Sequence, residues 1–154
     1  MLDTPFEIIS SVIVWIACAI AMALGGRPER IGAAAIWLAW LLSVLTQGRS
    51  VSGFLDPQYA WIYIDGALFL ALTWLALRSG RKWPTPAAAC QALMLGTHVA
   101  MGFDLAIRAY AYLTAIAIWS LGVLIALVVG VFTEAEAERR RVLQAQAGTR
   151  DTPA

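Results

Sequence analysis

Long apolar stretches alternate with short polar segments along the whole chain. The apolar stretches are about 17 to 24 residues long, and glycine, proline or charged residues separate them. About 20 apolar residues in an α-helix are enough to cross the hydrocarbon core of a bilayer. The pattern therefore predicts five transmembrane helices, at residues 6–26, 31–47, 59–77, 86–103 and 109–132.

The fifth apolar stretch is followed by a polar segment that keeps a helical pattern. Glu136 and Arg140 are spaced i, i+4, in the order that stabilises a helix. We therefore expect the fifth helix to continue into the cytoplasm over residues 133–147. Residues 148–154 are predicted to be a disordered tail, and residues 1–147 to form a single helical domain.

The composition agrees with an all-α membrane protein built as a bundle of five transmembrane helices. The chain is 60% hydrophobic and only 14% charged, whereas a soluble domain is about half apolar and about a quarter charged. A water-soluble fold would lack the polar groups to cover its surface. The chain has the general look of short, alanine- and tryptophan-rich multi-pass proteins of bacterial inner membranes, and no motif identifies a family.

The basic residues predict the orientation, because segments rich in lysine and arginine stay in the cytoplasm. Five crossings put only Arg49 and Arg108 on one side of the membrane. The opposite side receives the other nine basic residues: Arg27, Arg30, Arg78, Arg81, Lys82, Arg139, Arg140, Arg141 and Arg150. The N-terminus is therefore predicted outside and the C-terminus in the cytoplasm, with the chain in the inner (plasma) membrane. Trp83 and Tyr112 are expected at the membrane interfaces.

Residue types suited to metal or covalent chemistry are few. Cys18 and Cys90 both lie in apolar stretches, and the simplest interpretation is that they are small buried residues. A disulfide between them would need an oxidising compartment and close approach. One histidine and no Cys-x-x-Cys motif argue against a metal site, and no cofactor is expected. Glycine-rich phosphate loops and a nucleophile elbow are absent from the sequence, so no catalytic residue is assigned and no nucleic-acid partner is expected.

Two ionisable residues, Asp65 and His98, lie well inside apolar stretches, where charge is costly and points to function. Asp65 is ~9 Å along the helix from Tyr59, and His98 is ~7.5 Å along the helix from Phe103. Because Tyr59 and Phe103 stand at the same predicted face of the membrane, the two side chains are expected at similar depth in its outer third. Their depth does not fix whether they face each other.

Other polar residues gather at the same level. Gln91 is the exception: it lies seven residues before His98, deeper in the membrane but on the same helical face. The candidate intramembrane polar site comprises Asp65, His98, Gln91, Thr114, Asp104 and Arg108. In one interpretation these side chains satisfy each other and hold the helices in register, with Asp104 and Arg108 as an interfacial ion pair. In the other, Asp65 and His98 form an outward-facing site that exchanges protons or holds a small polar or cationic ligand.

Small residues recur every four positions on three of the predicted helices, a spacing that allows close helix packing in lipid. They are Ala17, Ala21 and Gly25 on the first helix, Ala92, Gly96 and Ala100 on the fourth, and Gly122, Ala126 and Gly130 on the fifth. We expect the first, fourth and fifth helices to form the tight core of the bundle, or one of these stripes to face a partner protein.

These features support two functional hypotheses. The first is a non-catalytic accessory, assembly or scaffolding subunit, which packs against lipids, other membrane proteins or copies of itself. The second is a small oligomeric transporter or channel with its polar site at Asp65 and His98. An integral membrane enzyme that uses His98 and Asp104 as acid and base is a weaker third hypothesis.

Overall fold

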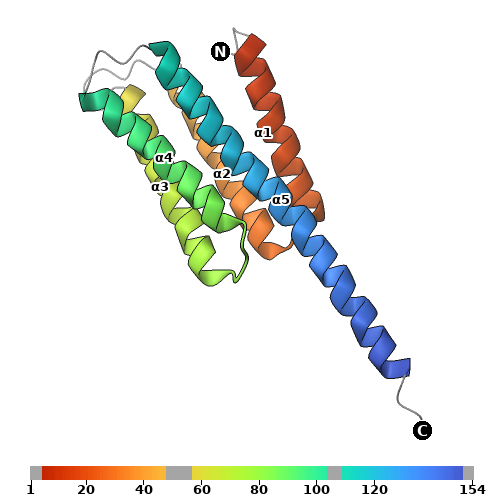
Figure 1. Cartoon of the computed structure of the whole chain (residues 1–154). Coiled ribbons are helices and arrows are strands. Elements are labelled where there is room, and N and C mark those ends of the chain that lie inside the picture. Colours follow the sequence, from red (N-terminus) through yellow and green to blue (C-terminus); the bar gives the residue numbers. More distant parts are fainter. Residues whose placement is uncertain (1–4, 48–56, 104–108, 151–154) are drawn as a thin grey trace.

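The computed structural model describes residues 5–47, 57–103 and 109–150, and these residues form five α-helices (Figure 1). The helices are α1 (Pro5–Leu24), α2 (Arg27–Gln47), α3 (Pro57–Arg78), α4 (Pro84–Phe103) and α5 (Ala109–Arg150). The predicted all-helical fold is confirmed. The first predicted helix was two residues too long, because Gly25 and Gly26 lie between α1 and α2. The fifth helix continues through residues 148–150, which were predicted as part of the tail.

Three of the helices are long and apolar enough to cross a membrane. The qualifying stretches are Arg27–Thr46, Ala60–Arg78 and Ala111–Ala137. The apolar part of α1, Ile8–Leu24, is slightly shorter. The outer surface of the bundle is also apolar: Leu70 and Leu77 are 67% and 83% exposed, and many other large apolar side chains point outward. Such a surface is typical of contact with lipid or with another protein rather than with water.

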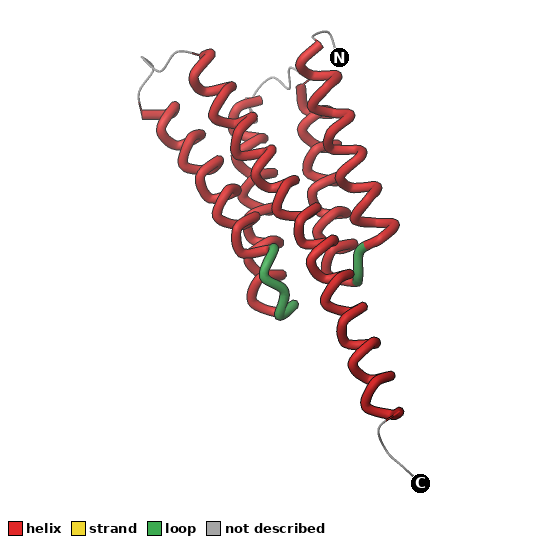
Figure 2. Tube along the Cα trace, turned by 45° about the vertical axis from the view of Figure 1, so that its right-hand side comes forward, coloured by secondary structure: helices red, strands yellow, loops and turns green. Residues whose placement is uncertain are grey.

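The helices form a closed ring. Each helix packs against its neighbours in the chain, and α1 also packs against α5. Consecutive helices run in opposite directions, and α5 projects beyond the other four toward the C-terminus (Figures 1 and 2). The residues between α1 and α2 (25–26) and between α3 and α4 (79–83) lie at the same end of the ring, which we call the connection end. Gly80 there has a φ of 65°, the left-handed conformation that commonly follows a helix C-terminus.

The core at the connection end is built around Trp83. Its ring lies between α2 and α5: a Cβ on Gly130 would be 2.3 Å from Trp83 Cγ, and one on Gly32 would be 2.4 Å from Trp83 Cη2. Only glycine leaves room for the indole at these two positions. Trp83 was expected at the membrane interface, but it is buried. The sequence could not predict this position, because the space for the Trp83 ring is left by two glycines that belong to other helices.

Trp83 also belongs to a polar cluster. Its Nε1 donates a hydrogen bond to Oε1 of Glu29, 3.0 Å away, and Glu29 is fully buried. Arg81 Nε lies 3.8 Å from the same oxygen, and Arg81 forms a second ion pair with Glu134. The cluster ties the start of α2, the segment between α3 and α4, and the projecting part of α5 together. Because charges are costly to bury, the Arg81 pairing is needed to compensate Glu29.

The small-residue stripes differ in their surroundings. Ala17 and Ala21 of α1 are buried, and so is Gly25, which follows the helix. On α5, Gly130 is buried against Trp83, a Cβ on Gly122 would be 2.7 Å from Cys90 Sγ, and Ala126 is partly buried. The stripe on α4 is exposed instead: Ala92, Gly96 and Ala100 all lie on the outer surface.

The α4 stripe therefore does not pack inside this chain, and contact of this stripe with a partner protein, the other expectation for the stripes, stays a prediction. The buried face of α4 carries Gln91, Met94 and His98. Alanine is spread around α4, so small residues do not select one face. The polar side chains do, because an unsatisfied polar group exposed to lipid costs several kcal/mol, of the order of 2–7. Helix α4 therefore turns its polar face inward and leaves its small residues outside.

Candidate functional site

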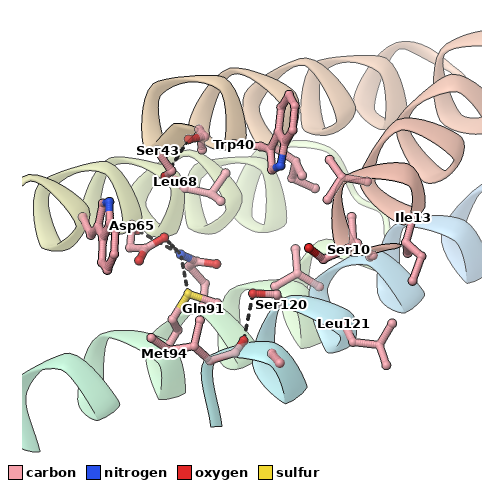
Figure 3. Close-up of a pocket in the computed structure, with 18 of the residues that line it drawn as sticks. Ser10, Ile13, Trp40, Ser43, Asp65, Leu68, Gln91, Met94, Ser120 and Leu121 are labelled. Atoms are coloured by element: carbon pink, nitrogen blue, oxygen red, sulfur yellow. Dashed lines mark hydrogen bonds between the residues drawn. The ribbon is translucent and has the colours of Figure 1, made fainter. Parts of the chain in front are cut away.

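A cavity of about 460 Å³ lies inside the ring, with lining residues from all five helices. Most of these side chains are aliphatic or aromatic. Polar groups are few and lie on several helices: Ser10, Ser11, Ser43, Asp65, Gln91, His98 and Ser120. Figure 3 shows Asp65 and Gln91 on one side of the cavity, with Ser10 and Ile13 across from them. Ligand pockets in proteins have this size and this mainly apolar character, with a few placed polar groups.

Asp65, in the first half of α3, is the centre of the polar cluster. Its Oδ2 lies 2.8 Å from His98 Nε2, and its Oδ1 accepts a hydrogen bond of 2.9 Å from Gln91 Nε2. Gln91 and His98 both belong to α4, seven residues apart on one helical face. They are 1% and 4% exposed, whereas the Asp65 side chain keeps 17%. The two α4 side chains thus hold the carboxylate at the cavity wall.

Tyr112, near the start of α5, completes the cluster. Its hydroxyl lies 2.8 Å from His98 Nδ1, and the two rings are nearly perpendicular. With the imidazole proton on Nε2, His98 donates to Asp65 and accepts from the Tyr112 hydroxyl, so both ring nitrogens have a hydrogen-bond partner. A protonated His98 would donate at both nitrogens. Asp65, His98 and Tyr112 therefore link α3, α4 and α5 through one imidazole.

The cavity presents acceptors more than donors. Ser43 donates its hydroxyl proton to Ala39 O, 2.9 Å away, and Ser120 donates to Ile116 O, 2.8 Å away. Each hydroxyl oxygen therefore keeps lone pairs as acceptors. The Asp65 carboxylate adds further acceptor positions. Trp61 also lines the cavity, and its buried Nε1 has no hydrogen-bond partner within the described ranges, which is a costly state for an indole N–H.

The structure brings some of the predicted site residues together. Asp65, His98 and Gln91 are in contact with one another. Thr114 lies on the exposed surface of α5 and does not line the cavity. Asp104 and Arg108 lie outside the described residues, so the acid–base pair of His98 with Asp104 is not among the contacts seen. His98 has Asp65 and Tyr112 as its partners.

Sequence reasoning missed Tyr112 and the serines. Tyr112 was read as an interface aromatic, although it stands two residues before Thr114, at nearly the depth assigned to Asp65 and His98. That depth was the available signal. The serines of α1, α2 and α5 gave none, because serine is common in membrane helices as a partner of its own backbone, the bond that Ser43 and Ser120 make.

The cavity ends before the connection end of the ring. The next buried side chains in that direction include Leu72, Leu127, Val131 and Trp83, which belong to the apolar core and do not line the cavity. Asp65 and His98 are the two ionisable residues among those that line it. A proton exchanged at Asp65 therefore has no path of ionisable lining residues toward the connection end.

No group of three or more His, Cys, Asp and Glu that could hold a metal ion occurs in the described part of the chain. Comparison of the chain with protein families, with curated proteins and with solved structures finds no match.

Proposed function

We propose that this chain is a five-span protein of the inner membrane that binds a small molecule, with Asp65 as the binding group. The observation that carries the proposal is the position of Asp65. A carboxylate held by two buried side chains stands in the wall of a mainly apolar cavity of about 460 Å³. A purely structural polar contact would not need a cavity beside it. Ionisable residues in membrane helices are commonly found at binding sites and transport pathways.

The geometry of the ring supports five crossings. Helices α1 and α4 have 20 residues each, which corresponds to a length of ~30 Å and matches the ~30 Å hydrocarbon core. Both run beside helices that are long and apolar enough to span the membrane (Figure 1). If those three cross, α1 and α4 occupy the same depth of the bilayer.

The charges support an orientation with the C-terminus in the cytoplasm. The connection end holds Arg27 and Arg30 at the start of α2, Arg78 at the end of α3, and Arg81 and Lys82 just after it. The projecting part of α5 carries further arginines on that side. By the positive-inside rule this end is cytoplasmic. Asp65, His98 and Tyr112 then lie in the outward half of the membrane, and the N-terminus lies outside.

The side chains of the site have distinct roles in this proposal. Asp65 binds a hydrogen-bond donor or a positive charge on the ligand. Gln91 and His98 position the carboxylate, and Tyr112 positions the imidazole of His98. This is the outward-facing site of a transporter or of a binding protein.

The test compares variants of Asp65 and of its partner His98 with a variant that removes a carboxylate elsewhere. Asp65→Asn and His98→Gln should fold in detergent and lose binding or flux of small organic cations after reconstitution. Glu136→Gln, on the exposed part of α5, should leave both unchanged. Wild-type binding in Asp65→Asn would show that the carboxylate only holds helices together.

An accessory-subunit function is the second candidate, and the exposed stripe on α4 favours it. A Cβ added to Gly96 would meet nothing within 4 Å, so the stripe is free for close approach of another helix. Gly96→Leu should then leave the chain folded and dissociate its partner. Native mass spectrometry of the protein in mild detergent would detect a stoichiometric partner protein, and Gly66→Leu is the control, since Gly66 also has open space beside it.

A further inference from the structure

The cavity reaches the outer surface of the ring between α1 and α5. Four side chains line the cavity and are also exposed: Ile9 and Ile13 from α1, and Leu113 and Leu121 from α5. Side chains that line the cavity and are also exposed mark the place where its lining meets the outer surface of the ring, which we call the mouth. Figure 3 shows Ile13 and Leu121 on the side of the cavity away from Asp65. The mouth is thus formed by α1 and α5, which ring closure brings together from the two ends of the chain.

The opposite wall is closed. The lining residues of α3 and α4 include Leu68, Gln91, Met94 and His98, all of which are buried. No lining residue of these two helices is exposed in the part of the chain that the structure describes. A molecule that enters from the side therefore passes between α1 and α5 and meets Asp65 at the far wall.

The surface around the mouth is apolar. Val12 and Ile16 on α1, and Ile118 and Ile125 on α5, are about half exposed next to the mouth residues. In a five-span protein this surface contacts the acyl chains of lipid. A mouth in such a surface admits molecules that are already dissolved in the bilayer, and it disfavours small hydrophilic ions, which would have to leave water first.

The wall opposite the mouth, formed by α3 and α4, determines which chemical group the inner end of the ligand carries. Among the described residues that line the cavity, Asp65 is the one with an acidic side chain, and its carboxylate keeps 17% of its surface exposed. Elsewhere in the lining, Ser43 on α2 and Ser120 on α5 donate their protons to their own helices and so offer acceptors. An ammonium group has donors and no acceptor, so it complements the Asp65 carboxylate in both charge and hydrogen bonding.

We propose that the ligand is an amphiphilic amine that enters from the lipid between α1 and α5. Its ammonium group binds Asp65, and its apolar chain passes through the mouth and remains in the bilayer. This inference rests on the proposed function, since it assigns the class of ligand and its route to the same cavity. It adds two features that the function alone does not require, namely a charged head and a lateral path.

The experiment uses the full chain in phosphatidylcholine vesicles. The probe is dodecylamine with a small fluorophore at the far end of its chain, excited by energy transfer from the protein tryptophans. Titration gives Kd, and rapid mixing gives the association and dissociation rates. Two variants narrow the mouth, Ile13→Phe on α1 and Leu121→Phe on α5. Ile16→Phe is the matched control, an exposed isoleucine of α1 that does not line the cavity.

Lateral access predicts that each mouth variant slows association and dissociation by roughly tenfold, within the range that association rates cover among related variants. Kd should change little, because the binding wall is intact. Ile16→Phe should behave as wild type. Wild-type rates in both mouth variants would overturn the lateral path while leaving the proposed function standing. Having one variant on each side of the mouth keeps the test valid if one of them fails to fold.

The head group is tested separately. Asp65→Asn should weaken binding of the amine by about thirtyfold or more, as expected when one partner of a desolvated charge pair is removed. The alcohol with the same chain and fluorophore should bind wild type that much more weakly than the amine does. Equal binding of the alcohol would overturn the charged head. No saturable binding of either probe to wild type would overturn the inference, and binding of small organic cations by the same wild-type protein would show that the proposed function still stands.

Discussion

The space that Gly32 and Gly130 leave for the Trp83 indole gives the most direct test of the packing, because a glycine-to-alanine substitution adds a single carbon atom there. Gly130→Ala would place a Cβ 2.3 Å from Trp83 Cγ and 2.5 Å from Trp83 Cβ. Neither atom is the flexible end of a side chain. The indole cannot turn away without losing its hydrogen bond to Glu29 and moving toward Gly32, which holds its other edge.

The expected cost follows from comparison with Gly96→Ala. Both glycines lie inside helices, so the gain in helix propensity from alanine, up to about 1 kcal/mol, is common to both variants. At Gly96 the new Cβ meets nothing within 4 Å. At Gly130 it overfills a packed core, which costs about 1–3 kcal/mol. Gly130→Ala should therefore be about 1–3 kcal/mol less stable than Gly96→Ala.

The assay is reversible unfolding in mixed micelles by a denaturing detergent, which gives the free energy of unfolding for each variant. Trp83→Ala in the Gly130→Ala background should remove the extra cost of the alanine, because the clash partner is gone. Equal stability of Gly130→Ala and Gly96→Ala would refute the reasoning. It would mean that Trp83 is not seated against α5.

Two further predictions concern the polar contacts. Arg81→Met should lower the free energy of unfolding by about 1–3 kcal/mol, because it leaves the buried Glu29 without its cation. Arg140→Met should lower it by less than about 0.5 kcal/mol, because its i, i+4 ion pair with Glu136 is exposed. The same unfolding assay compares the two variants, and equal losses would contradict a structural role for the buried pair. Tyr112→Phe should leave the chain folded and lower the free energy of unfolding by about 0.6 kcal/mol, with an upper value near 1.7, since it removes one hydrogen bond to His98. The same variant should weaken binding of the amine. An unchanged Kd would show that Tyr112 does not position the imidazole.

The helices and the relative level of Asp65 and His98 along the bundle could be predicted from the sequence. The breaks between apolar stretches fall at glycine, proline and charged residues, so only ends such as Leu24 differ by a few residues. Because the rise per residue of a helix is fixed, the sequence predicts Asp65 and His98 at the same level, and the two side chains are 2.8 Å apart.

The rotation of each helix could not be predicted. Helix α4 carries small residues on several sides, and the stripe at Gly96 looked as suitable for packing as the face of Gln91. The choice depends on Asp65 of α3 and Tyr112 of α5, which no periodicity within α4 reveals. Trp83 is a similar case. An aromatic residue beside basic residues is typical of a membrane interface, and only the gaps at Gly32 and Gly130 explain why it is buried.

The cavity could not be predicted for a related reason. It is the space left when five helices of unequal side-chain volume close into a ring, and its lining comes from every helix. Ser43 and Ser120 are unremarkable in their own segments. They become part of a site only because ring closure brings α2 and α5 to the same cavity as Asp65.

We propose that five helices cross the membrane and place Asp65 and His98 in its outward half. The most direct test is labelling of single cysteines by a membrane-impermeant maleimide, in a variant whose two native cysteines are replaced by alanine. With five crossings, Thr4→Cys, Ser50→Cys and Ala106→Cys should react from outside the intact cell, and Ser79→Cys should react only after the membrane is opened. Labelling of Ala106→Cys and Ser79→Cys from the same side would show that α4 does not cross, and would contradict the five-span topology.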